Sequence, residues 1–140
     1  MDYVNAFLCG GLLCVYDSEG ALISKTIYKK ENNQETVSNY FSDGSLDTEE
    51  VITYSDDGSV ESIVRFSSIS DGSETDIFRY TDGKLTEVTT YNQDKQVINR
   101  LVIKYDSVGN ISRLSDYEVL KKFGTTVNEL AAQTDFVFEY

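Results

Sequence analysis

The stretch that decides the fold is Tyr105-Asp106-Ser107-Val108-Gly109-Asn110-Ile111. Its tyrosine ends Val97–Tyr105, a run rich in β-branched residues, and such runs favour β-strands. The segment that follows contains a glycine, which adopts positive φ without steric cost, as tight hairpin turns require. The stretch therefore predicts a strand, a tight turn and a second strand.

The same pattern recurs through most of the chain. Aromatic residues return every 11 to 14 residues, at a mean spacing of about 12.6, and a polar turn segment follows eight of the nine. They are Tyr16, Tyr28, Tyr40, Tyr54, Phe66, Tyr80, Tyr91, Tyr105 and Tyr117. Eight turns separate nine strands, and Thr134–Tyr140 is expected as a tenth. Tight turns leave no room for the crossovers that parallel strands need, so the strands are predicted to be antiparallel.

The expected fold is one all-β domain over residues 1–140, an antiparallel meander of about ten strands. It divides into an apolar N-terminal segment (1–15), hairpin repeats (16–117), a short helix or loop (118–133) and a final strand (134–140). Thr126 followed by Glu129 matches a helix capping box, and Asp2 is expected to cap a short helical turn over Tyr3–Leu8. Two architectures stay open, an open curved sheet and a partly closed barrel.

The composition excludes several kinds of site. The 140 residues contain no His, which rules out a Ser-His-Asp triad, a Cys-His pair and a His-ligated metal. The 24 acidic and 12 basic residues give a net charge of −12, which disfavours binding to nucleic acids and anionic membranes. No turn has the acid spacing of a calcium loop, and there is no glycine-rich phosphate loop. We expect no enzymatic activity, no cofactor and no metal site.

The stretch Tyr3–Tyr16 carries no charged residue, but it is shorter than the roughly 20 residues of a membrane-spanning helix. Its acidic start and the lack of a cleavage site do not fit a signal peptide, which favours a cytoplasmic protein or delivery without a cleaved signal. A surface or secreted location stays open if a leader was removed. Cys9 and Cys14 are expected as buried thiols, with a disulfide across the Gly10-Gly11 break as the alternative.

Negative charge is concentrated in residues 31–82, which contain 13 acidic and 2 basic residues. Neighbouring strands of a meander lie side by side, so this segment predicts one acidic surface that binds a basic protein partner. The candidate partner-binding residues are Asp43, Asp47, Glu49, Glu50, Asp56, Asp57 and Glu61. Solubility and protection of strand edges are the alternative roles of these charges.

Three segments together resemble a known bacterial repeat. Tyr105–Ile111, Tyr16–Leu22 and Tyr54–Val60 resemble the YD (tyrosine–aspartate) repeat of Rhs-type surface and toxin-delivery proteins. The resemblance covers roughly Tyr16 to Tyr117 and implies a curved β-sheet, built from tandem hairpins, that has no catalytic residues of its own.

The leading functional hypothesis is a non-catalytic binding or structural module that binds protein through the acidic surface. One alternative is an immunity-like or antitoxin-like partner of a basic toxin. Another is an up-and-down barrel that carries a small apolar ligand. Association of copies through sheet edges is also left open.

Overall fold

The computed structural model describes residues 5–9, 11–70 and 72–139, with side chains for 11–70 and 72–139. These described residues form eleven β-strands and no helix. The strands are β1 (Asn5–Cys9), β2 (Leu12–Tyr16), β3 (Leu22–Glu31), β4 (Gln34–Phe41), β5 (Leu46–Tyr54), β6 (Val60–Ser67), β7 (Gly72–Thr81), β8 (Lys84–Tyr91), β9 (Val97–Tyr105), β10 (Ile111–Lys122) and β11 (Thr125–Asp135).

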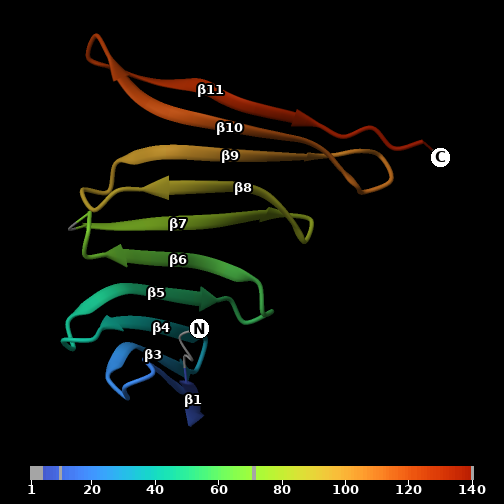
Figure 1. Cartoon of the computed structure of the whole chain (residues 1–140). Helices are drawn as coiled ribbons and strands as arrows, with labels where there is room; N and C mark the ends of the chain where they lie inside the picture. The colour runs from blue at the N-terminus through green and yellow to red at the C-terminus, as the bar shows by residue number, and fades with distance from the viewer. Residues whose placement is uncertain (1–4, 10, 71, 140) are drawn as a thin grey trace. The chain divides into compact units, whose positions relative to one another are not determined.

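The chain divides into two compact units, Met1–Ser73 and Glu74–Tyr140, called unit 1 and unit 2. In unit 1, each strand from β2 to β6 pairs antiparallel with the strand before it. In unit 2, β8 to β11 do the same (Figure 1). The strand order is the chain order and does not close on itself. The predicted all-β antiparallel meander is confirmed, and it is open.

A repeated turn joins many of these strands. In each case a tyrosine pairs with the aliphatic residue six positions later, across the turn. The pairs are Tyr16 with Leu22, Tyr40 with Leu46, Tyr54 with Val60, Tyr91 with Val97 and Tyr105 with Ile111. The residue four positions after each tyrosine has positive φ, between 59° and 100°. This geometry is a tight turn followed by a one-residue bulge.

Glycine occupies the positive-φ position in four of these five turns, and Lys95 (φ 59°) occupies it in the fifth. Gly44, Gly58, Gly83 and Gly109 have positive φ, as their turn positions predict. Gly72 is the first residue of β7. At Gly58 the main-chain N–H donates to the Ser55 carbonyl at 2.9 Å, which closes the turn between β5 and β6. Glycine is preferred because the left-handed region costs other residues roughly 1–2 kcal/mol.

Two further turns have only two central residues, both with positive φ, which is the type I′ geometry. Asp82 (φ 52°) and Gly83 join β7 to β8, and Phe123 (φ 53°) and Gly124 join β10 to β11. Aspartate suits this position, whereas a bulky aromatic residue rarely adopts positive φ. Phe123 is also fully exposed, so no packing compensates for its conformation.

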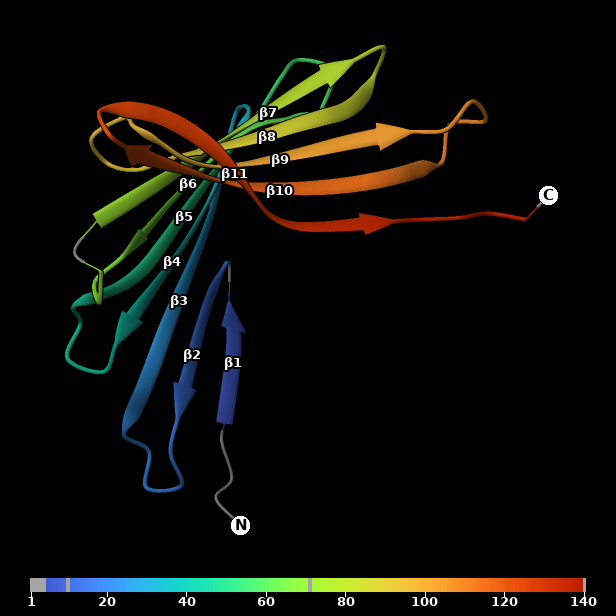
Figure 2. The ribbon, with the colours of Figure 1, turned by 90° about the horizontal axis from the view of Figure 1, so that it is seen from above.

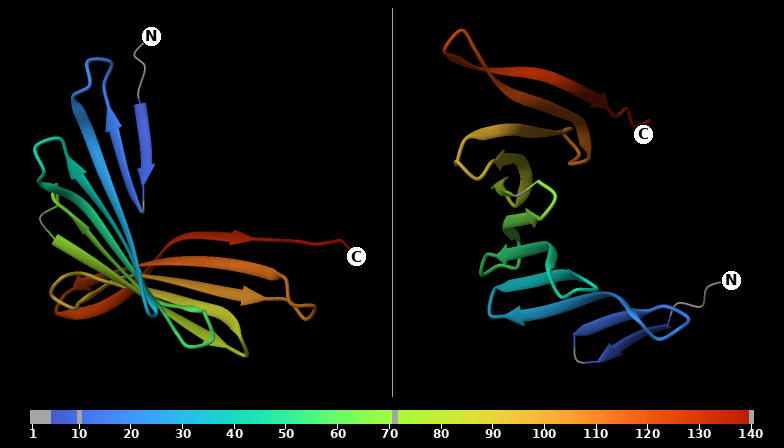
Figure 3. Two further views of the ribbon diagram at one scale, coloured as in Figure 1. Left: turned by 90° about the horizontal axis from the view of Figure 1, so that it is seen from below. Right: turned by 60° about the vertical axis from the view of Figure 1, so that its left-hand side comes forward.

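Each unit is a single layer of strands. Within either unit, no described helix or second sheet lies over a face (Figure 1, Figure 3). Successive strands such as β3, β4 and β5 are rotated against one another, which is the usual twist of a sheet (Figure 2). Ile103, at 8% exposure, is the one buried hydrophobic side chain among the described residues. The strands therefore have no apolar core beneath them.

The predicted helix between Tyr117 and Gln133 is wrong. Thr126 and Glu129 lie in β11, where they pair with Lys121 and Glu118 of β10. A capping box is a local signal, and the ladder to β10 satisfies the main-chain hydrogen bonds that a helix would otherwise form. The final strand also ends at Asp135, so residues 136–139 belong to no strand.

The predicted helical turn over Tyr3–Leu8 is also wrong where the structure describes it. Asn5–Cys9 is strand β1, paired antiparallel with β2. Pairing with an adjacent strand again satisfies the main chain, which outweighs a weak local preference. The expected cap at Asp2 lies outside the described residues.

Replacing Gly58 tests the repeated turn. A Cβ at this position would meet no atom within 4 Å, so only the backbone conformation (φ 86°) opposes a side chain. We expect Gly58→Val to lower the free energy of unfolding by about 1–2 kcal/mol. Urea unfolding measures this change. Gly58→Asn is the control, because asparagine tolerates the left-handed region and should cost less. Equal stability of Gly58→Val and the parent chain would show that this turn geometry is wrong.

Replacing Phe123 tests the strained turn between β10 and β11 through a substitution that is expected to stabilise the chain. Phe123→Asn should raise the free energy of unfolding by up to about 1 kcal/mol, because asparagine accepts positive φ more readily. The corresponding change Asp82→Phe in the matching turn of β7 and β8 should lower stability. Thermal melts of both variants provide the measurement. A loss of stability in Phe123→Asn would mean that the aromatic ring contributes packing in solution.

Candidate functional site

The predicted partner-binding acids lie at both ends of β5 and along it. Asp43 is in the turn before β5, and Asp56 and Asp57 are in the turn after it. The nine residues of β5 separate these turns by roughly 25–30 Å. Asp47 lies near the start of β5, where its carbonyl accepts the Ser68 N–H at 2.9 Å. The seven acids therefore do not form one compact patch.

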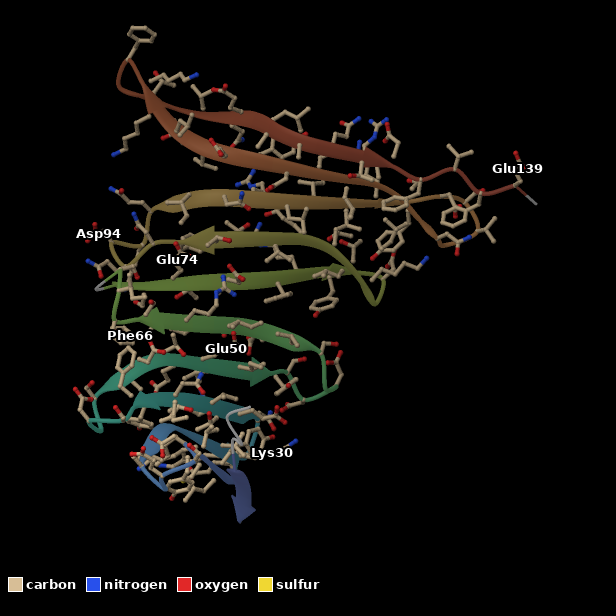
Figure 4. The ribbon with its side chains drawn as sticks, viewed as in Figure 1. Lys30, Glu50, Phe66, Glu74, Asp94 and Glu139 are labelled. Carbon is tan, nitrogen blue, oxygen red and sulfur yellow. The ribbon has the colours of Figure 1, made fainter. Side chains whose placement is uncertain are left out.

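Glu49 and Glu50 lie on opposite faces of unit 1, because successive side chains of a strand alternate. Glu49 lies opposite Ser38, whose hydroxyl donates to its carboxylate at 2.9 Å. Glu50, midway along β5 (Figure 4), lies opposite Arg65 of β6. A single flat partner could not contact both of these acids.

Two of the predicted acids hold turns together. The Asp43 carboxylate accepts hydrogen bonds from the Ser45 hydroxyl (2.6 Å) and main-chain N–H (2.8 Å). The Asp57 carboxylate accepts the Ser55 hydroxyl (2.5 Å) and the Ser59 N–H (2.9 Å). The serine hydroxyl is the main reason that the pKa of each carboxyl is lowered from its ordinary value. Both side chains stabilise the local turn.

Three other acids surround a hollow at the far end of β5 from Asp43. This acidic hollow has a volume of about 530 Å³ and is lined by the acids Glu31, Asp56 and Glu61, all exposed. Its other lining residues are Asn32, Asn33, Gln34, Thr53, Tyr54 and Ser55. The structure therefore brings Asp56 and Glu61 together and adds Glu31, which is absent from the predicted set.

Cross-strand hydrogen bonds position this lining. The Tyr54 N–H donates to the Asn33 carbonyl at 2.8 Å, which holds the turn of β3 and β4 beside the end of β5. The Asn33 side-chain amide donates to the Asp56 carboxylate at 3.1 Å, and the Gln34 amide donates to the Thr53 hydroxyl at 3.3 Å. Alternate turns of a meander lie at the same end of the sheet, so the turn before β4 and the turn after β5 are neighbours. This rule could have identified Glu31 from the sequence.

The carboxylates of the acidic hollow differ from Glu35 nearby in β4. Glu35 accepts the Lys30 ammonium at 2.7 Å and the Tyr54 hydroxyl at 3.2 Å. Lys30 is the main cause of the lowered Glu35 pKa, while partial burial and Glu35 itself raise the pKa of Tyr54. Within the described residues, no Lys or Arg forms an ion pair with Glu31, Asp56 or Glu61. These three carboxylates therefore have no ion-pair partner among the described residues, and the cation Lys29 lines a smaller adjoining hollow together with Glu31.

Charge differs between the two units. Unit 1 contains 13 acidic and 4 basic residues, and unit 2 contains 11 and 8. In unit 2 several acids have ion-pair partners: Glu87 lies 3.4 Å from Arg79 and 3.7 Å from Arg100, and Arg113 pairs with Asp135 at 2.5 Å. The excess negative charge therefore belongs mainly to unit 1.

Metal-binding groups and membrane-spanning helices are absent from the part of the chain that the structure describes. There, no group of three or more His, Cys, Asp or Glu residues has a geometry that could hold a metal ion. None of its elements is a helix long and apolar enough to cross a membrane. Cys14 is a free, half-buried thiol, while the side chain of Cys9 lies outside the described residues.

Comparisons with known proteins assign no family. No protein-family model matches the chain, and no curated protein sequence matches it. A porin-like protein from Bacteroides uniformis ATCC 8492 is similar in structure, with 14% identity and a TM-score of 0.47. The match covers 89% of this chain, which spans 56% of that protein's length. A protein of unknown function from Bacteroides fragilis NCTC 9343 matches with 10% identity and a TM-score of 0.35, over 97% of this chain and 92% of that one.

Because of the Lys30–Glu35 pair, the free energy of unfolding is expected to vary with pH in the acidic range. The folded-state pKa of Glu35 lies below its ordinary value of 4.5. As the pH falls, the Glu35 carboxylate is therefore protonated in the unfolded chain before it is protonated in the folded chain. The stabilisation is complete above pH 4.5 and is lost as the pH drops through the lowered pKa. We expect Glu35→Gln to flatten this part of the curve of unfolding free energy against pH, measured by urea unfolding. Glu74→Gln, at an exposed site in unit 2, is the control; a similar flattening there would argue against the pair.

Proposed function

We propose that the chain is a non-catalytic β-repeat module that binds a basic protein partner through the acidic hollow of unit 1. The observation that carries the proposal is the group Glu31, Asp56 and Glu61, which shares one hollow without an ion pair to a described Lys or Arg. Other acids of unit 1 already have roles, as Asp43 and Asp57 hold turns and Glu35 pairs with Lys30.

The negative charge of unit 1 is also expected to speed its association with a basic partner. Like charges concentrated at one end of a sheet repel one another and raise the local negative potential. A basic surface relieves this repulsion, and the long-range attraction speeds its approach. Salt screens the attraction over about 8–10 Å at moderate ionic strength, so association should slow steeply as salt is added.

The repeats support a binding module rather than an enzyme. The tyrosine, tight turn and aliphatic residue recur in both units, as the resemblance to Rhs-type YD repeats implies. We include membership of this bacterial repeat group in the proposal. A basic toxin bound by an immunity-like protein is one form that the partner could take.

The barrel that carries an apolar ligand has less support. Such a carrier needs a closed sheet around an apolar cavity. The strand order is open, and the acidic hollow is lined by polar side chains and one tyrosine. Association of copies through sheet edges stays a prediction.

A charge-matched pair of variants tests the proposal. Glu31→Gln, Asp56→Asn and Glu61→Gln together remove three charges from the hollow but keep its oxygen acceptors. The control removes three exposed acids elsewhere, through Glu19→Gln, Glu74→Gln and Asp94→Asn. Partners are captured from the native organism at low and at high salt, and association rates of each purified partner are then measured with both variants.

We expect the hollow variant to slow association at least several-fold at low salt, with little effect at high salt. The control variant, with the same net charge, should change the rate much less. Equal slowing in both variants would show that only total charge matters. An unchanged rate in the hollow variant would remove the hollow from the mechanism.

A further inference from the structure

The chain contains four Asp-Gly pairs, and the environments of the three that the structure describes in full differ. The four pairs are Asp43-Gly44, Asp57-Gly58, Asp71-Gly72 and Asp82-Gly83, of which Asp71 lies outside the described residues. In an Asp-Gly pair, the main-chain nitrogen of glycine can attack the side-chain carbonyl carbon of aspartate, because glycine has no side chain to block the approach. Whether this attack happens depends on how firmly the structure holds the two reacting groups.

Both groups are held at Asp43-Gly44 and Asp57-Gly58. Each carboxylate accepts a main-chain N–H and a serine hydroxyl. Each glycine N–H donates to a main-chain carbonyl, Gly44 to Phe41 at 3.0 Å and Gly58 to Ser55 at 2.9 Å. An attack would have to break these bonds first, and hydrogen bonds to a charged carboxylate are stronger than those between neutral groups.

Neither group is held at Asp82-Gly83. Among the described residues, none donates a hydrogen bond to the Asp82 carboxylate, and none accepts one from the Gly83 N–H. Both residues are exposed at the tip of the β7–β8 hairpin, and both have positive φ, 52° and 75°. The nucleophile and the carbonyl carbon therefore meet no hydrogen bond that opposes their approach.

We propose that Asp82-Gly83 is a site of spontaneous aspartate isomerisation, and that the turns at Asp43 and Asp57 are protected. The Gly83 nitrogen bonds to the side-chain carbonyl carbon of the protonated Asp82 carboxyl group, whose C–OH bond breaks, and the hydroxyl leaves as water with the nitrogen's proton. This step forms a five-membered succinimide. Water then opens the ring. Attack on the former side-chain carbonyl restores aspartate, and attack on the former main-chain carbonyl gives isoaspartate with a free α-carboxylate.

The product changes the hairpin at its most constrained point. In isoaspartate the chain runs through the side-chain carbon, so the turn gains one methylene in its main chain. A two-residue type I′ turn fixes the register of its strands, here through the pair Thr81 and Lys84. Isomerisation therefore acts as a slow covalent modification that loosens the end of β7 and β8. It is independent of the proposed binding by unit 1.

The test is to age the folded full chain in heavy-oxygen water at neutral pH and physiological temperature. Each ring opening inserts one heavy oxygen, and peptide mapping with fragmentation locates both this label and the isoaspartate. A parallel sample is aged in denaturant, where the pairs at Asp43, Asp57 and Asp82 lose their structural differences. The variant Asp82→Glu is the control, because it cannot form a five-membered ring.

In the folded chain we expect label and isoaspartate at Asp82 several-fold sooner than at Asp43 or Asp57. In denaturant the three rates should converge, and Asp82→Glu should remove the early product. Equal rates at Asp82, Asp43 and Asp57 in the folded chain would overturn the proposal. So would a large difference among them that persists in denaturant, since sequence and not structure would then set the rates.

Discussion

Pairing between neighbouring strands is the interaction on which the rest of this structure depends. Since each unit is a single layer, no apolar core beneath the sheet contributes, and both faces carry polar and apolar side chains. The stabilising contacts are therefore the main-chain ladders and the side chains that face each other across them. The recurring pair of a tyrosine with an aliphatic residue places such a contact beside the turn, where strands would otherwise separate.

The same dependence explains the polar centre of the sheet. Ser38, Thr89 and Ser115 are buried although they are polar, and each lies opposite a larger aliphatic residue on an adjacent strand: Ile27, Ile77 and Val102. Hydrogen bonds between facing side chains run across several strands, as in Thr26 to Asn39 (2.7 Å) and Asn39 to Thr48 (2.9 Å). A sheet with two solvated faces can carry many charges, and this permits the acidic excess of unit 1.

Aspartate illustrates how one residue type takes several roles in such a sheet. Asp57 accepts hydrogen bonds within its own turn, whereas its neighbour Asp56 faces the acidic hollow. Asp82 occupies a left-handed turn position and has neither role. The surrounding donors, which differ from turn to turn, decide between a structural role and the binding and reactive roles that we propose. Counting acids in a sequence cannot make this distinction.

The sequence by itself determined the antiparallel strands and most of the turns, because both depend on local chemistry. A glycine four residues after a tyrosine sets the turn, and a tight turn forces antiparallel pairing. Only the tertiary structure decided the C-terminal hairpin, since Thr126 and Glu129 favour a helix locally and β10 supplies their partners. It also decided which acids meet: strand direction brings Glu31 to Asp56 across 25 residues, while the alternation of side chains separates Glu49 from Glu50.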